Sequence, residues 1–227
     1  MRAAEAAVRI GDGRVVGELR VGVPFREGPP LMSSAPTGVR RRHPGVQVTL
    51  AATHDGTGAD EVRRGHLDLV IMSRFGADAG TAETGLHQVA VGRDPLRLCV
   101  PDHHRLAGAT ECPVSELSAE PWVLGPATPL GRLILGLCAV AGFEPSIAAT
   151  VPDVAAALGL VDAGWGVTIA PALTPAGRDG CGLRRIPLCG VDVFRHHVLL
   201  MRAGEERSPS IAAVVAAVQS AGTEGLS

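Results

Sequence analysis

The sequence predicts an α/β fold with two lobes, and three observations lead to this prediction. Apolar runs typical of strands alternate along the 227 residues with segments typical of helices, a pattern that favours a parallel sheet covered by helices. Aromatic residues make up only 3% of the chain and tyrosine is absent, so the core must consist of Val, Leu, Ile and Ala, which suits such a sheet. A polar loop lies between two apolar strands at residues 92–95 and again at 189–195, which predicts that the chain crosses twice between the lobes.

These two crossings define the domain boundaries that we expect. Residues 1–16 form a separate segment, which is rich in helix formers up to Gly11 and reads as the tail of a helix. Lobe I is expected to consist of residues 17–92 and 193–221. Lobe II, residues 93–192, is then an insertion into lobe I.

Five strands are expected in the first half of the chain. Alternating residues predict the first two, and a nearly continuous apolar run predicts a third that is buried on both faces. A short helix at 60–64 is expected to end at Gly65, because glycine accepts the left-handed conformation, whereas a helix at 31–42 is weakened by Pro36. The strands are expected at 18–23, 46–50, 67–72, 86–91 and 96–100.

The second half repeats this alternation of strands and helices. Asp153 is expected to cap one helix, since its carboxylate can accept hydrogen bonds from first-turn amides. Ser208 is the expected N-cap of the closing helix, with Pro209 at the first helical position. The helix that Asp153 caps is expected at 154–163 and a further helix at 130–141, and the strands are expected at 122–124, 147–151, 167–170, 183–188 and 197–201.

Seven short motifs follow one another along the chain at the spacing of one known family. They are Gly17-x-Leu19-Arg20-Val21-Gly22, Arg42-His43-Pro44-Gly45-Val46, Leu67-Asp68-Leu69-Val70-Ile71, Pro101-Asp102-His103-His104-Arg105-Leu106-Ala107, Leu117 with Glu120-Pro121-Trp122-Val123, Ala141-Gly142-Phe143-Glu144-Pro145, and Leu160-Val161-Asp162-Ala163-Gly164-Trp165-Gly166-Val167. From about Gly17 to Ala217 the chain therefore resembles the effector-binding domain of LysR-type transcriptional regulators. It departs from the family pattern at Arg105, where proline is usual.

This resemblance implies both a fold and a function. The fold is similar to that of type II periplasmic binding proteins, with two Rossmann-like lobes joined by two crossover strands and a small effector held in the cleft. The function is to sense a small, anionic metabolite and thereby control transcription. Family members carry a helix-turn-helix and a linker helix before this domain, whereas residues 1–16 resemble only a remnant of that linker helix. We therefore expect no direct DNA binding by these residues; truncation, a misassigned start codon and genuine loss of the head all stay open.

The effector site is expected where strands end and helices begin, because free amides and the helix dipole favour anions there. In the family the first such segment usually offers a hydroxyl to the effector. Here it contains Pro24 and Arg26, so either Arg26 binds an acidic ligand or the site has degenerated. Trp165 and Gly166 are expected along the wall of lobe II, although Trp165 equally suits packing. The candidate segments are Pro24, Phe25 and Arg26; Ser73 and Arg74; and Gly125, Pro126, Ala127 and Thr128, the last of which is expected to cap the helix that follows.

Several classes of function are not expected from this sequence. The five cysteines stand singly, which argues against a zinc site, although a redox pair of Cys181 with Cys189 stays open. GxSxG, P-loop and GxGxxG motifs are absent, so we expect neither an enzyme nor a cofactor. The net charge of −2 gives the chain no general attraction to DNA. Without a signal peptide or a membrane-spanning run, the protein is expected in the cytoplasm and off the membrane.

The expected partners are a small-molecule effector and a second copy of the chain. The resemblance implies a homodimer formed through the helix at 31–42 and the strand at 46–50 of lobe I, although Pro36 would kink that helix. DNA is expected as a partner only through a helix-turn-helix that these residues do not contain. The alternative function is a stand-alone cytoplasmic solute-binding protein, which shares the two-lobe arrangement.

Overall fold

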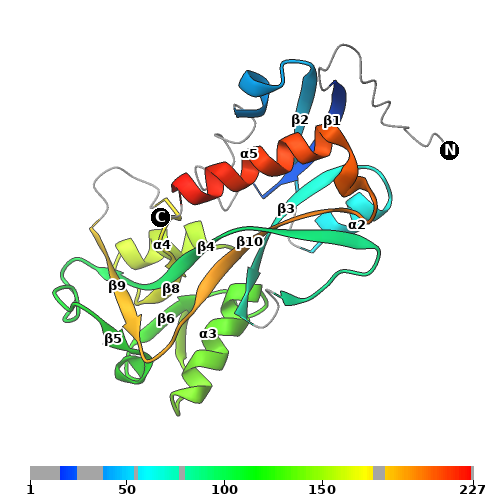
Figure 1. Cartoon of the computed structure of the whole chain (residues 1–227). Coiled ribbons are helices and arrows are strands. Elements are labelled where there is room, and N and C mark those ends of the chain that lie inside the picture. The colour runs from blue at the N-terminus through cyan, green and yellow to red at the C-terminus, as the bar shows by residue number, and fades with distance from the viewer. Residues whose placement is uncertain (1–15, 25–37, 54–55, 77–79, 176–181, 226–227) are drawn as a thin grey trace. The chain divides into compact units, whose positions relative to one another are not determined.

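A computed structural model of the chain describes residues 16–24, 38–53, 56–76, 80–175 and 182–225. Internal contacts divide the chain into two units (Figure 1). Unit 1 consists of Met1–Arg93 and His196–Ser227, and unit 2 consists of Asp94–Arg195. The predicted boundaries, at 92/93 and 192/193, lie close to these. The α/β class and the two connecting strands expected from the sequence are confirmed.

Unit 1 is built on a sheet in which β1 (Gly17–Val23) lies between two parallel neighbours. These are β2 (Val46–Ala52) and β3 (Leu69–Phe75), and β10 (Phe194–Arg202) and β4 (Leu86–Pro101) continue the strand order as β2-β1-β3-β10-β4. The strands alternate their side chains between two apolar clusters. One cluster packs against α5 (Pro209–Gly225), and the other against α2 (Gly58–Arg63). The sheet is therefore covered on both faces, as the apolar runs predicted.

Unit 2 contains the second half of β4, which pairs antiparallel with β8 (Thr168–Pro171) and β9 (Leu183–Cys189). The short strand β5 (Cys112–Pro113) adds to β9 and is followed by a 3₁₀ turn, η3 (Val114–Leu117). A separate parallel pair consists of β6 (Pro121–Leu124) and β7 (Ser146–Thr150). Each of these two strands leads into a helix.

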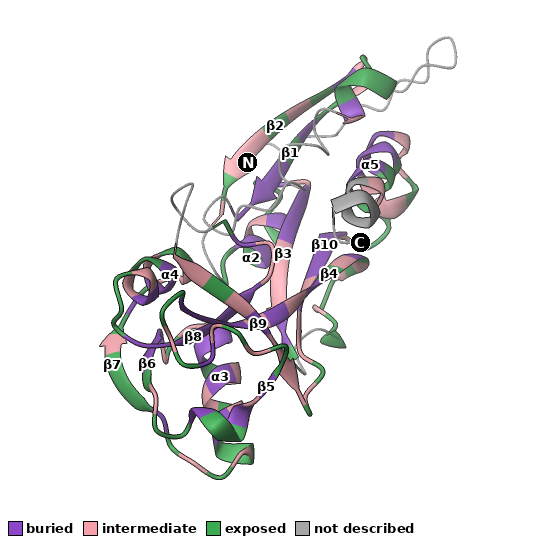
Figure 2. Ribbon diagram, turned by 90° about the vertical axis from the view of Figure 1, so that its left-hand side faces the viewer, coloured by how far each residue is buried: buried purple, intermediate pink, exposed green. Residues whose placement is uncertain are grey.

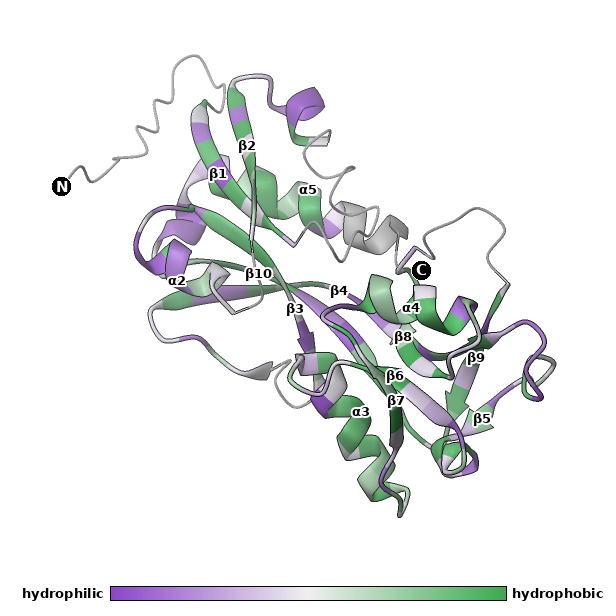
Figure 3. Ribbon diagram, turned by 180° about the vertical axis from the view of Figure 1, so that it is seen from behind, coloured by the Kyte–Doolittle hydropathy of each residue, from purple (hydrophilic) through white to green (hydrophobic). Residues whose placement is uncertain are grey.

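Those two helices are α3 (Pro129–Val140) and α4 (Val154–Asp162). Figure 3 shows that α3 is apolar along most of its length, and its inner face is buried. By contrast, most of β7 is exposed along its length (Figure 2). Unit 1 also contains the helical residues 38–42 before β2 and a 3₁₀ turn, η4 (Glu205–Arg207), before α5.

Two sequence expectations about strands are wrong. Residues 92–95 do not form a loop, because β4 continues without a break through them. The reason is that Asp94 is fully buried and forms an ion pair with Arg195, so the polar residues are satisfied inside the strand. The third strand spans Leu69–Phe75 rather than 67–72, which places Ser73 and Arg74 within the strand instead of after it.

Two of the residues expected to delimit helices, Asp153 and Gly65, behave as predicted. The Asp153 carboxylate accepts a hydrogen bond from the Ala156 amide at 2.9 Å. Gly65, which follows Arg64 at the C-terminal end of α2, has a φ of +74°, the left-handed conformation that ends a helix. Asp68, just before β3, accepts from the Arg20 amide at 2.8 Å. Its role in the described structure is therefore to join β1 to the start of β3.

Candidate functional site

The turn between β6 and α3 is held in one conformation by Thr128. Its hydroxyl donates to the Gly125 carbonyl at 2.8 Å and accepts from the Gly131 amide at 2.9 Å, which makes Thr128 the N-cap, as expected. Pro126 and Pro129 have no N–H groups, so the amides that remain in the turn are those of Ala127 and Leu130. The partial positive charge of the helix N-terminus adds to them. This turn can bind an anion.

Two glycines allow the backbone of this turn to pack closely. A Cβ on Gly125 would lie 2.3 Å from the Val151 carbonyl oxygen, and one on Gly131 would lie 1.9 Å from the Gly125 oxygen. Real Cβ atoms do not approach backbone atoms this closely, so any other residue would displace the turn. The position of the α3 N-terminus therefore depends on both glycines.

A second helix begins at the same edge of the β6–β7 pair. Because the two strands are parallel, with Leu124 opposite Thr150, their carboxyl ends lie together. At the start of α4 the Asp153 side chain caps the first turn. The Asp153 carboxylate already places a negative charge at this helix end, so a bound anion is favoured at α3 rather than at α4.

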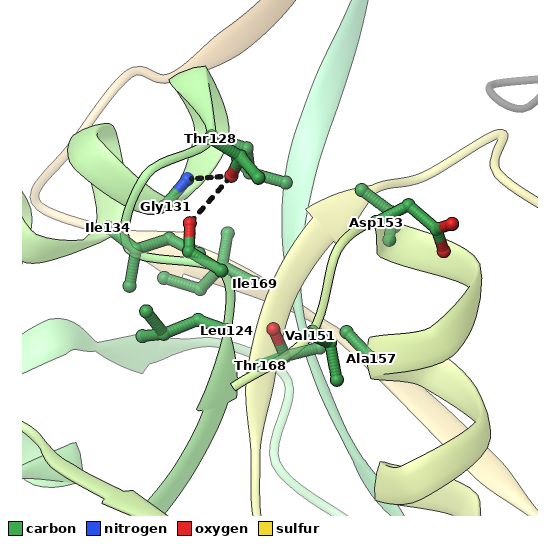
Figure 4. Close-up of a pocket in the computed structure, with 12 residues that line it drawn as sticks. Leu124, Thr128, Gly131, Ile134, Val151, Asp153, Ala157, Thr168 and Ile169 are labelled. Carbon is green, nitrogen blue, oxygen red and sulfur yellow. Dashed lines mark hydrogen bonds between the residues drawn. The ribbon is translucent and has the colours of Figure 1, made fainter. Parts of the chain in front are cut away.

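A small pocket lies between the first turns of α3 and α4 (Figure 4). Its volume is about 20 Å³, room for roughly one water molecule. Most of its walls are apolar, and three lining residues are polar: Thr128, Asp153 and Thr168 of β8, the last of which is only 2% exposed. The lining residues are Leu124, Gly125, Thr128, Leu130, Gly131, Ile134, Val151, Asp153, Val154, Ala157, Thr168 and Ile169.

The structure brings the Gly125 and Thr128 of the predicted site together at this pocket, while Trp165 and Gly166 lie at the other end of α4. The Trp165 amide donates to the Leu160 carbonyl, and its side chain is 55% exposed. Gly166 has a φ of +145°, and a Cβ there would lie 2.2 Å from the Pro121 carbonyl oxygen. Gly166 is thus required by the backbone.

The predicted residues of unit 1 fall into two groups. Pro24 is buried directly after β1, whereas Phe25 and Arg26 lie outside the described residues. In β3, the Ser73 hydroxyl is buried and has no hydrogen-bond partner among the described residues. The Arg74 side chain is already paired, since its Nη2 donates to Glu83 Oε1 at 2.6 Å. Of these residues, Ser73 therefore offers the clearest free polar group.

Glu83 accepts from two arginines at once, Arg74 and Arg63. The Arg74 guanidinium beside Glu83, together with that of Arg63, holds the pKa of this carboxyl below its ordinary value. Glu83 in turn neutralises the positive charge of Arg74 within unit 1. This weakens the case for Arg74 as a ligand for an anion.

Sequence reasoning missed Thr168 and the apolar residues that surround it in the pocket. The available signal was a single threonine in the otherwise apolar run Val167-Thr168-Ile169-Ala170. Such a threonine is also common in strands without any function. Only its burial in the wall of the pocket distinguishes it, and this burial is not visible in the sequence.

Metal and thiol chemistry have no evident site in the described residues. No group of three or more potential metal ligands occurs there. Burial raises the pKa of the Cys99 and Cys138 thiols to about 11, so both are protonated near neutral pH. Cys181, half of the redox pair left open above, lies outside the described residues. Among the helices described, none combines the length and the apolar composition that a bilayer span requires.

Comparison with known proteins identifies the family of the chain. Residues 12–223 match the model of the LysR substrate binding domain. An uncharacterized HTH-type transcriptional regulator, YnfL of Escherichia coli (strain K12), is 28% identical over 214 residues, which cover 92% of this chain and 69% of that protein. The chain spans between 43% and 69% of the lengths of the curated relatives it matches.

Two solved structures with bound small molecules have the same fold. The BenM effector binding domain with its effector benzoate has a TM-score of 0.76 at 21% identity, covering 92% of this chain and 94% of that one. The effector binding domain of QuiR in complex with shikimate has a TM-score of 0.76 at 16% identity, covering 93% of this chain and 100% of that one. At these identities the likeness shows the fold alone.

Proposed function

This chain belongs to the family of LysR substrate-binding domains, and on that premise we propose that it is the effector-binding part of a cytoplasmic transcriptional regulator. Its effector is a small carboxylate. In this proposal the domain itself carries out no catalysis, and contact with DNA is made by a helix-turn-helix outside these residues. Effector binding then changes how the regulator acts on its genes.

The observation that carries this proposal is the first turn of α3. Thr128 fixes the turn, the amides of Ala127 and Leu130 remain for a ligand, and the helix dipole favours a negative charge. Benzoate and shikimate, the molecules bound by the two structural relatives, are both carboxylates. A carboxylate at the α3 turn therefore combines the chemistry of the turn with that of the relatives' ligands.

Further contacts to the effector are proposed from the sequence alone. They comprise Pro24, Phe25 and Arg26 after the first strand, Ser73 and Arg74 of β3, Pro126 of the α3 turn, and Trp165 with Gly166 beyond α4. Among these, the unpartnered hydroxyl of Ser73 gives the strongest reason for a ligand contact.

The carboxylate proposal is tested by adding a charge at the turn. Ala127 is exposed, so Ala127→Glu keeps the fold and places a competing carboxylate beside the binding amides. The matched control is Ala139→Glu, which adds the same charge at an exposed position in the last turn of α3. Thermal shifts of the wild-type chain with benzoate and shikimate measure binding, and a ligand at about 100 times its Kd adds about 2.7 kcal/mol of stability.

We expect the apparent affinity obtained from these shifts to be at least tenfold lower for Ala127→Glu than for the wild-type chain. For Ala139→Glu we expect the affinity to be unchanged. Equal shifts in both variants would exclude the α3 turn as the carboxylate site. If the wild-type chain is stabilised by no small carboxylate at all, the proposed class of effector is wrong.

A further inference from the structure

Two arginines of unit 2 lie on one face of the sheet without a carboxylate to neutralise them. Between residues 97 and 99, β4 runs between β8 and β9, and Arg97 is opposite Pro187 while Cys99 is opposite Arg185. Arg97 and Arg185 are therefore diagonal neighbours on the same face, roughly 7–8 Å apart at the backbone, which long side chains can span. Among the described residues, neither guanidinium forms an ion pair with a carboxylate.

The Arg185 guanidinium is held in place by two carbonyl groups. Its Nη1 donates to the Pro171 carbonyl at 2.8 Å, and its Nη2 donates to the Thr174 carbonyl at 2.5 Å. A carbonyl oxygen orients a guanidinium but carries no net charge. Of the five N–H donors that a guanidinium has, three remain for other partners. Arg185 is thus a positive charge in a fixed position, with donors available for an anion.

Arg97 has no polar side chain opposite it on either neighbouring strand. It is paired with Ala170 of β8 and with Pro187 of β9. The acid closest to Arg97 in the sequence, Asp94, points to the other face of β4, because side chains alternate along a strand. Asp94 is also neutralised by Arg195. The Arg97 guanidinium therefore remains available for a ligand on this face.

An apolar cluster adjoins the two arginines. Cys99 and Ala170, on the same face, pack against Leu158 of α4, and all three are at most 1% exposed. Arg97 and Arg185 are themselves half-buried. A charge that is partly removed from water gains more from an opposite charge than an exposed one does, and two like charges this close repel each other. A bound anion would offset both effects.

Thr174 adds a hydroxyl group beside Arg185. The residue is only 4% exposed, and its Oγ1 is buried without a hydrogen-bond partner among the described residues. Because the Thr174 carbonyl accepts from Arg185, this hydroxyl belongs to a residue that already touches the guanidinium. A buried hydroxyl without a partner lowers the stability of the folded state. A ligand oxygen that accepts a hydrogen bond from Thr174 would remove that loss.

The charges and donors of this cluster fit a phosphate group better than a carboxylate. Two guanidiniums supply two positive charges, and a phosphate group carries about −1.5 to −2 near neutral pH. A single carboxylate would leave one of the two positive charges unpaired. The several oxygens of a phosphate can also accept from two arginines and a hydroxyl at once, and arginine forks match phosphate geometry.

We propose that unit 2 contains a second anion site, formed by Arg97, Arg185 and Thr174, which binds free phosphate or the phosphate group of a monoester. The site shares no residue with the α3 turn at which the effector carboxylate is proposed. Neither proposal therefore depends on the other. Together they make unit 2 a receptor for two different anions.

Isothermal titration of the full chain with inorganic phosphate, in a chloride buffer, tests this site. We expect Arg97→Gln to lower the affinity about tenfold or more, the usual effect of losing a hydrogen bond from a charged group. Thr174→Val should lower it less, because that hydroxyl is uncharged. Arg97 is the principal variant, since it makes no hydrogen bond among the described residues that the fold would lose. Far-UV circular dichroism establishes that each variant is folded.

A matched control is provided by the neighbouring arginine of β9. Arg184 is exposed and is paired with Val100, so it points to the opposite face from Arg185. Arg184→Gln removes the same charge as Arg97→Gln and should change the phosphate affinity by less than about twofold, because exposed charges are screened. An equal loss in both variants would show a general effect of charge and refute the site.

The choice of ligand separates the possible sources of the anion. Glycerol 3-phosphate is compared with inorganic phosphate, and tighter binding of the ester identifies a phosphorylated metabolite, whereas equal or weaker binding identifies the free ion. Acetate and malonate should both bind at least about tenfold more weakly than phosphate. If malonate, a dicarboxylate, binds as tightly as phosphate, the proposed class of ligand is wrong.

The α3 turn also attracts anions, so Ala127→Glu is titrated with phosphate as well. We expect this variant to bind phosphate as tightly as the wild-type chain. A loss of phosphate binding in Ala127→Glu but not in Arg97→Gln would place the phosphate at the α3 turn and overturn the second site. So would a wild-type chain that binds phosphate with a Kd weaker than about 1 mM.

Discussion

Asp94 and Arg195 form an ion pair from which water is almost wholly excluded. Their side chains are 0% and 1% exposed, and Arg195 Nη2 lies 2.7 Å from Asp94 Oδ2. The Leu173 amide also donates to both carboxylate oxygens at 3.3 Å. Such pairs contribute little net stability, because desolvation offsets the attraction, but removal of one partner leaves a buried charge.

We expect Arg195→Met to lower the free energy of unfolding by about 3–5 kcal/mol, because the Asp94 charge is then buried without its partner. In the double variant Asp94→Asn/Arg195→Met no charge is buried, and the amide oxygen can still accept from Leu173. The free energy of unfolding of the double variant should therefore fall by less than that of Arg195→Met. Urea denaturation measures the free energy of unfolding of the wild-type chain, of Arg195→Met and of the double variant.

The exposed pair Arg64–Glu61, 3.9 Å apart, serves as the control for this series. Arg64→Met should change the free energy of unfolding by less than about 1 kcal/mol. A double variant less stable than Arg195→Met would show that the two residues are not coupled through their charges.

The lowered pKa of Glu83, in unit 1, makes the stability of the folded chain depend on pH. The pKa of the Glu83 carboxyl is lowered by Arg74 and Arg63 in the folded chain. The stability that Glu83 contributes is therefore fully present above the pKa that this carboxyl has in the unfolded chain, and it is lost as the pH falls through its pKa in the folded chain. Glu83→Gln should therefore destabilise the chain near neutral pH, and the difference from wild type should shrink below about pH 4.5. Thermal unfolding between pH 3 and 7 tests this. Glu144→Gln, at an exposed position, is the control, and a pH-independent difference would contradict the prediction.

The α4 helix shows how one element is delimited by glycines with different roles. Asp153 begins the helix, and the amides of Gly164 and Trp165 end it by donating to the Val161 and Leu160 carbonyls. Gly164 has a φ of +83° but open space around it, whereas Gly166 combines a φ of +145° with close contact to a carbonyl. Gly159 lies within the helix with no atom near its missing Cβ.

Three glycine-to-alanine changes along this element should have graded effects. Gly159→Ala should stabilise the chain by about 0.5–1 kcal/mol through helix propensity. Gly164→Ala should destabilise it by about 1–2 kcal/mol, the strain of the left-handed conformation. Gly166→Ala should cost about 3 kcal/mol or more, because strain and a backbone clash add. Guanidinium denaturation gives the order of stability of the three variants. A Gly166→Ala protein as stable as Gly164→Ala would show that a Cβ at position 166 does not clash with the backbone.

The first turns of α3 and α4 show what could be predicted from the sequence. The two predictions are the start of α4 at Asp153 and the capping of α3 by Thr128. Both depend on local hydrogen bonds, which short residue patterns encode, and both predictions are confirmed. The continuity of β4 through residues 92–95 was not predictable, because it depends on Arg195, about a hundred residues away. Likewise, the place of Thr168 in the wall of the pocket depends on which side chains surround it in space.

At the scale of the whole molecule, self-association is proposed through lobe I. The helix described over residues 38–42 precedes β2, an edge strand whose Gln47 and Thr49 side chains are exposed. Residues 31–37 of the predicted interface lie outside the described residues. An edge strand of this kind offers unpaired backbone groups to a second copy of the chain.

We expect the wild-type chain to sediment as a dimer and Gln47→Lys/Thr49→Lys to sediment as a monomer, because lysines on an edge strand oppose pairing. Analytical ultracentrifugation measures both. Glu111→Lys, at an exposed position of unit 2, should leave the dimer intact. Dimers of unchanged affinity in the double-lysine variant would place the interface elsewhere.

The interruption of unit 1 by unit 2 has a consequence for synthesis on the ribosome. Every residue of unit 2 has been added once Arg195 is incorporated, whereas unit 1 still lacks β10 and the α5 helix that covers its sheet. Unit 2 can thus complete its core while the N-terminal strands of unit 1 still lack β10 and α5. This order is the reverse of the usual one, in which the N-terminal domain folds first during translation. During that interval the apolar face of β1 and β3 lacks the helix that covers it in the folded chain.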